Sequence, residues 1–148
     1  MCIYDVLVDH GNFDKLLQLI DANDGIRTLL VEEDGPFTLF APTDSAFVQF
    51  EKFLSENETS LVAVLANNEM VGKLLSNHLL EDELTREDLE ELNDQSVTFM
   101  NGHSVKINSD DPGNILIDES IIEESDLLSS NGVVHIIDTI LMPDNLVI

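Results

Sequence analysis

Apart from its carboxylates, the chain has few side chains able to do acid–base, nucleophilic or metal chemistry. The four histidines are His10, His78, His103 and His135, and the one cysteine is Cys2. No two histidines have the His-x-x-x-His spacing, and there is no Cys-x-x-Cys pair, Gly-x-Ser-x-Gly elbow or glycine-rich phosphate loop. The chain is therefore predicted not to be an enzyme.

One stretch of oxygen-bearing residues has the spacing of a calcium loop that joins two helices. The matching positions are Asn108, Asp110, Pro112, Gly113, Ile115 and Glu119. However, Pro112 offers no side-chain ligand, Asn108 lacks the usual charge, and the flanking residues alternate as strands do. We interpret the stretch as a hairpin loop or a coincidence, and weak calcium binding by the acidic clusters on the surface stays an alternative.

Carboxylates dominate the charge of the chain. Thirty aspartates and glutamates face six lysines and arginines among 148 residues, so at least 30 − 6 = 24 acids have no cationic partner. Such a surface repels itself at low salt and suits a saline medium. Nucleic acids and anionic lipids are bound through Lys and Arg clusters, so the charge argues against both as partners.

No apolar run approaches the length of a membrane span, so we expect no direct membrane insertion. There is no basic, apolar leader either, and we expect any secretion signal to lie outside this sequence or to have been removed.

The first half of the chain has mainly helical periodicity. After a short apolar segment, Ile3–Val8, apolar residues recur at helical spacing. The helical segments lie around residues 13–20, 26–30, 46–50, 61–65, 70–75 and 89–92. Ser60 and Thr85 are placed to cap the helices that follow them, and Asp88 completes a capping box with Thr85.

The second half changes to the periodicity of strands. Val97 and Phe99, then Val105 and Ile107, alternate around the dipeptide at 101–102, Asn-Gly, which is a strong hairpin signal. Further strands are expected at 115–117, 121–122 and 133–141, and an isolated earlier strand at 37–40 must join them. The chain is therefore predicted to be one α+β domain over residues 1–148.

Two segments resemble the signature blocks of the fasciclin-type domain family. The first is Phe37-Thr38-Leu39-Phe40-Ala41-Pro42-Thr43-Asp44-Ser45-Ala46-Phe47, and the second is Asn131-Gly132-Val133-Val134-His135-Ile136-Ile137-Asp138-Thr139-Ile140-Leu141-Met142-Pro143. Between them, Asn77-His78-Leu79-Leu80 falls where that family usually has Tyr-His followed by apolar residues. The order and spacing match one whole domain.

The resemblance implies a compact wedge of β-strands with several helices, in an extracellular or cell-surface protein. It also implies adhesion to a cell-surface or matrix protein, or to a polysaccharide, without catalysis and without a cofactor. Asn77, His78, Leu79 and Leu80 are the candidate partner-binding residues, although the absence of the usual Tyr argues against integrin-type recognition.

The signature residues also have a purely structural interpretation, which we favour for most of them. These residues are Thr38, Phe40, Ala41, Pro42, Thr43, Asp44, Phe47, Gly132, His135, Asp138 and Pro143. Pro42 would end a strand, and Thr43 or Asp44 would cap the helix after it. A buried imidazole at His78 would bond backbone groups and lock a helix end to the sheet, and His135 has the same interpretation.

Three functions stay open at this stage. The leading hypothesis is a binding module for adhesion, and the second is a structural spacer whose surface has no specific ligand. The third is small-molecule binding or hydrolysis, which would need a deep pocket with two convergent carboxylates or a His–carboxylate pair. Fold resemblance by itself does not decide among them.

Overall fold

The computed structural model describes residues 2–110, 114–117 and 120–141. The helices are α1 (Ile3–His10), α2 (Asp14–Asp21), α3 (Asp24–Glu32), α4 (Asp44–Glu56), α5 (Leu61–Leu65), α6 (Asn68–Ser76) and α7 (Arg86–Glu91). The strands are β1 (Phe37–Pro42), β2 (Leu79–Leu80), β3 (Ser96–Thr98), β4 (Ser104–Asp110), β5 (Asn114–Ile117), β6 (Ser120–Ser129) and β7 (Gly132–Ile137). Among these residues, no helix is long and apolar enough to cross a membrane.

The strands form one mixed sheet of seven, in the order β2-β1-β7-β6-β5-β4-β3. β1 and β7 pair in parallel, and the other neighbours pair antiparallel. The isolated early strand thus joins the late strands, as predicted, and β7 lies inside the sheet with every residue buried. The sheet curls far enough that Met100 N, just after β3, donates to Leu79 O of β2 at 2.9 Å.

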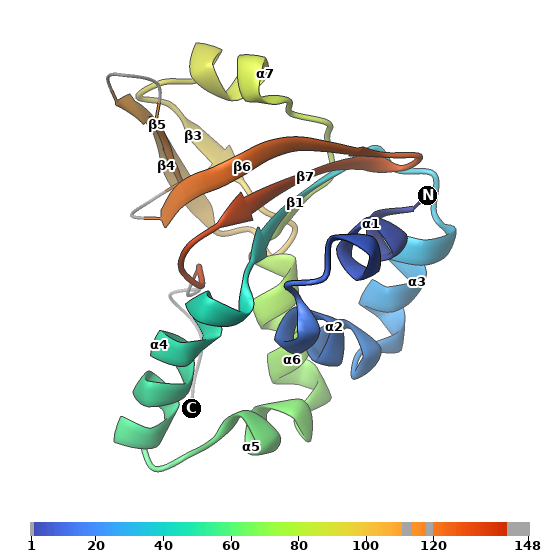
Figure 1. Cartoon of the computed structure of the whole chain (residues 1–148), viewed down its shortest axis with the longest axis vertical. Helices are drawn as coiled ribbons and strands as arrows, with labels where there is room; N and C mark the ends of the chain where they lie inside the picture. Colours follow the sequence, from blue (N-terminus) through green and yellow to red (C-terminus); the bar gives the residue numbers. More distant parts are fainter. Residues whose placement is uncertain (1, 111–113, 118–119, 142–148) are drawn as a thin grey trace.

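Helices gather on one side of the central strands, and Figure 1 shows α1, α2, α3 and α6 together there, with α7 at the far end. Two clusters of buried apolar side chains correspond to this arrangement. The larger lies between the helices α1 to α6 and the strands and includes Phe13, Phe47 and Leu54, all almost fully buried. The smaller is built mainly on the second half of the chain, around Phe40, Phe99 and Ile107. The α+β prediction is confirmed.

Hydrogen bonds and backbone angles confirm most of the predicted helix caps and the predicted hairpin turn. Ser60 Oγ accepts from Ala63 N at 3.3 Å, and Thr85 and Asp88 form the expected capping box. The turn at 101–102 joins β3 to β4, with Gly102 at φ 87°. The segment Ile3–Val8, for which no type was predicted, is the helix α1. The predicted strand at 121–122 is only the first part of the longer β6.

The prediction for the start of α4 is right about the end of the preceding strand and wrong about the helix cap. β1 ends at Pro42, as predicted. Thr43 is the N-cap residue by position, but neither its side chain nor that of Asp44 caps α4. Asp44 Oδ1 accepts instead from Lys15 N in the first turn of α2, at 2.9 Å. A carboxylate there satisfies a free amide and interacts favourably with the positive end of the α2 dipole.

Candidate functional site

The candidate binding segment begins with two buried polar side chains that hold the chain after β7. Asn77 Nδ2 donates to Leu141 O at 2.8 Å, and Leu141 N donates to His78 Nε2 at 2.9 Å. Both backbone groups of Leu141 are therefore satisfied by adjacent residues at the C-terminal end of α6. Asn77 Oδ1 also accepts from Asn101 Nδ2 at 3.0 Å, and it lies 2.9 Å from His103 Nδ1 in the same hairpin turn.

The hydrogen bonds of His78 determine its tautomer. Because Nε2 accepts from Leu141 N, the proton lies on Nδ1, which donates to Leu74 O at 2.8 Å. His78 is only 1% exposed, and burial lowers its pKa to about 4, although the bond to Leu74 O acts in the opposite direction. The imidazole is thus neutral at physiological pH and ties α6 to the end of β7.

His135, in the middle of β7, is also engaged at both ring nitrogens. Its Nε2 donates to Leu84 O at 2.7 Å, and its Nδ1 accepts from Asp126 N at 3.2 Å. Burial lowers the pKa of this imidazole as well. The ring stacks on Phe40, its register partner on β1, with 5.7 Å between centroids. Since neither buried histidine has a nitrogen to spare, neither is placed to act as an acid–base catalyst.

The other signature residues fill structural positions around the β1–β7 pair. Thr38 Oγ1 donates to Asp82 O at 2.6 Å and accepts from Leu84 N at 2.8 Å. Gly132 lies so close to Phe37 that an added Cβ would be 2.0 Å from Phe37 O. Asp138 Oδ1 accepts from Ile121 N at 2.9 Å, which extends the contact between β6 and the end of β7. The last signature residue, Pro143, is outside the described residues.

Asn131, predicted only as part of a turn, makes several long-range hydrogen bonds within the described part of the chain. Asn131 is 4% exposed, and its Oδ1 accepts from Ile3 N at 2.9 Å, at the start of α1. Its Nδ2 donates to Leu30 O at 3.0 Å and to Glu33 O at 3.2 Å, at the end of α3. One amide thus joins the β6–β7 turn to the ends of two helices, and the only sequence signal was its place beside Gly132 in the second block.

The four candidate partner-binding residues are brought together but covered. Asn77, His78, Leu79 and Leu80 are 0%, 1%, 0% and 4% exposed. Their role in partner binding therefore stays a prediction, and it would have to act through the surface that they support.

Part of the calcium-like stretch, residues 111–113 and 118–119, lies outside the described residues. Its described flanks are strands, β4 and β5, paired from Ile107 with Ile117 to Asp110 with Asn114. Elsewhere in the described parts of the chain, no three metal-ligating side chains are grouped as a metal site.

Comparison with known proteins agrees with this architecture. The family described as Fasciclin domain matches residues 11–143. The chain is 29% identical to Protein sll1483 of Synechocystis, over 97% of this chain and 74% of that protein. It is 31% identical to the pig transforming growth factor-beta-induced protein ig-h3, over 97% of this chain but 20% of that protein.

A solved structure has the same fold. It is a FAS1 domain pair from the insect cell adhesion molecule fasciclin I, and it matches with a TM-score of 0.74 at 16% identity. The match covers 92% of this chain and 49% of that one. The resemblance seen in the signature blocks is confirmed along nearly the whole sequence, and the chain belongs to the fasciclin domain family.

Proposed function

We propose that this fasciclin domain is an extracellular or cell-surface adhesion module that binds a protein or glycan partner and catalyses no reaction. The observation that carries the proposal is that the polar residues inside the fold and those on its exterior have different roles. Those of the family blocks and the candidate segment, such as Asn77, His78, Asn131 and His135, hold backbone groups inside the fold. The exterior carries the net charge of −24, so recognition would be a property of the surface.

Relatives support the setting of this proposal. A domain pair of the same fold comes from an insect cell adhesion molecule, and the chain matches only a fifth of the pig ig-h3 protein. In both cases the domain is one unit within a longer chain. A module of this kind would present a rigid face to its partner while neighbouring units set its position.

The test is adhesion of beads coated with the domain to a panel of cells, matrix proteins and polysaccharides. Each binding is measured at low salt and at seawater-like salt, with calcium or with a chelator. Selective binding to one member of the panel is the expected result, and it identifies the partner class. Loss of binding under chelator would assign the contact to cations that bridge the acidic clusters.

A domain that binds no surface under any of these conditions contradicts the proposal and favours the structural spacer. The matched control is the same domain carrying Asn131→Asp, which is expected to unfold more easily. Binding that survives complete unfolding of this variant would come from charge alone and not from the folded surface.

A further inference from the structure

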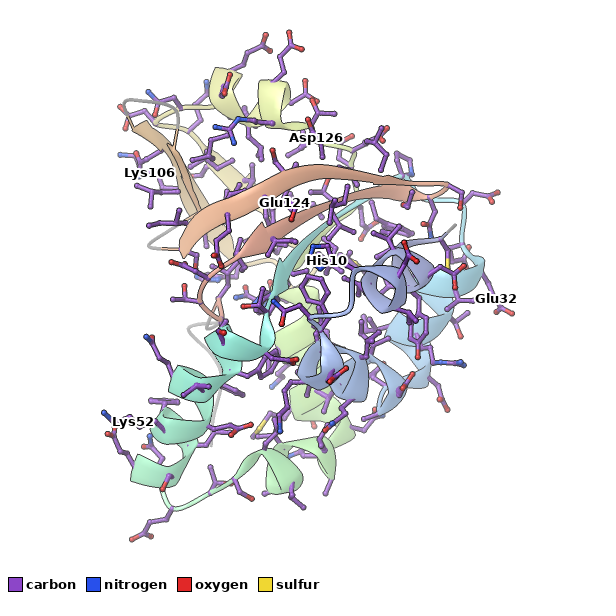
Figure 2. All side chains as sticks on the ribbon, viewed as in Figure 1. His10, Glu32, Lys52, Lys106, Glu124 and Asp126 are labelled. Carbon is purple, nitrogen blue, oxygen red and sulfur yellow. The ribbon has the colours of Figure 1, made fainter. Side chains whose placement is uncertain are left out.

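A polar pocket of about 330 Å³ opens beside the α1–α2 loop, where the start of α4 meets β6. Its polar lining residues are His10, Asn12, Thr43, Ser45, Glu123 and Glu124. Ile136 of β7 adds an apolar wall. His10 and Glu124, labelled in Figure 2, approach across the pocket, with 3.2 Å between His10 Nε2 and Glu124 Oε2.

A β-bulge brings two successive carboxylates to this pocket. Ile122 pairs with Ile137 and Glu124 pairs with Ile136, so Glu123 is an extra residue in β6. Side chains of a regular strand alternate between the two faces, and a bulge breaks that alternation. Glu123 and Glu124 therefore line the same pocket, and among the described residues that line it only His10 can carry a positive charge.

A hydroxyl of a largely buried residue also faces the pocket without a partner. Thr43 is 5% exposed, and although it lies at the N-cap of α4, its side chain makes no cap hydrogen bond. Among the described residues its hydroxyl has no hydrogen-bond partner at all. In the described part of the chain no buried side-chain oxygen lacks a partner, so this unpaired hydroxyl is reached by solvent and is available to a ligand in the pocket. Nearby, Ser45 and Asn12 add an exposed hydroxyl and an exposed amide.

We propose that this pocket binds the cationic head of an arginine or lysine side chain from a basic segment of the protein partner. The inference rests on the proposed function and names the contact. Carboxylates bind a guanidinium through two parallel hydrogen bonds, and hydroxyl and amide oxygens accept its remaining N–H groups. A net charge of −24 steers cationic partners toward the domain, and it disfavours anionic glycans.

The test uses the full chain and two small probes of nearly the same shape. N-acetyl-arginine methylamide carries the guanidinium, and N-acetyl-citrulline methylamide replaces it with a neutral urea. Each is titrated into the ¹⁵N-labelled protein, and the backbone amide shifts are followed by NMR. Saturable shifts at Thr43, Glu123 and Glu124 with the arginine probe alone are the expected result.

The double variant Glu123→Gln/Glu124→Gln is expected to weaken this binding about tenfold or more. Glu87→Gln/Glu91→Gln, which removes the same charge from exposed positions on α7, should leave it within about twofold. Equal weakening by both double variants, or shifts spread over the acidic surface, would mean charge attraction without a pocket and would overturn the proposal. Pocket shifts caused by a neutral hexose and not by the arginine probe would overturn it in favour of a glycan.

The bead assay distinguishes a wrong assignment of the pocket contact from a wrong proposal of adhesion. If the pocket variant still adheres like the parent protein while the arginine probe shows no saturable shifts, the adhesion module stands and this contact is wrong. If no surface is bound by the parent protein, the proposed function itself fails. An unchanged melting temperature of the pocket variant would show that any loss of binding comes from the pocket.

Discussion

Replacing Asn131 by aspartate tests the claim that one buried amide joins three elements. The two side chains have nearly the same shape, so the change adds no bulk and leaves no cavity. The oxygen that accepts from Ile3 N is kept. The nitrogen that donates to Leu30 O and Glu33 O is replaced by a second oxygen, which faces two carbonyl oxygens.

The expected cost follows from these contacts. A buried polar group left without its partner costs about 1–3 kcal/mol, and here two carbonyls lose their donor. Because Asn131 is only 4% exposed, water replaces the lost bonds poorly. We expect the free energy of unfolding to fall by about 4 kcal/mol at pH 7, a large share of the 5–15 kcal/mol typical of a whole domain.

The cost should also depend on pH. Burial and the nearby carbonyls raise the pKa of the new carboxyl above its unfolded value of about 3.9. Its protonated form can donate to one of the carbonyls. The deficit relative to the parent protein should therefore be smallest near pH 4 and should grow as the pH rises through the raised pKa.

Urea unfolding followed by far-ultraviolet circular dichroism measures both effects, since the chain has no tryptophan. Asn57→Asp is the matched control, because Asn57 is exposed and donates a single bond to Phe53 O at 2.8 Å. It makes the same change in charge and should cost less than about 1 kcal/mol. A cost at Asn131 no larger than that of the control, or one independent of pH, would refute the reasoning.

Three further predictions follow from single contacts or from the charge. Gly132→Ala should lower the free energy of unfolding in urea by more than about 3 kcal/mol, because its Cβ would meet Phe37 O at 2.0 Å and strain the β1–β7 pair. The control Gly102→Ala, at φ 87° with no atom near the added Cβ, should cost about 1 kcal/mol. Burial lowers the pKa of His78 to about 4, below its unfolded value of about 6.5. The free energy of unfolding should therefore be unaffected by this group above pH 6.5 and fall by up to about 3 kcal/mol as the pH falls toward 4. An NMR titration of the ring with a midpoint near 6.5 would contradict this. The melting temperature should rise between low salt and about 1 M salt, because screening relieves the repulsion among the carboxylates, and an unchanged value would count against that source of instability.

Periodicity and local capping could be predicted because the information lies within a few residues. The capping box at Thr85 and Asp88, and the hairpin turn before His103, are closed by neighbours in sequence. The parallel pairing of β1 with β7 was predictable only in outline, from the need of an isolated strand for a partner. Its register, Phe37 with Gly132, depends on how closely two backbones approach.

Side chains that bond distant backbone groups could not be predicted from local patterns. Asp44 has the position of a helix cap in its own segment, yet its oxygen accepts from Lys15, 29 residues away. Asn131 reaches Leu30, 101 residues away in the sequence. In both cases the partner is determined by tertiary packing, which overrides the local preference for a turn or a cap.

The polar residues that define the family differ from those expected to contact a partner. Helix ends and strand ends leave backbone groups unsatisfied, and Asn77, His78 and Asn131 satisfy them from inside the core. A side chain with all its hydrogen bonds made internally has little left to offer a ligand. Recognition then falls to groups that the fold leaves incomplete, and the hydroxyl of Thr43 beside the bulged carboxylates of β6 is such a group.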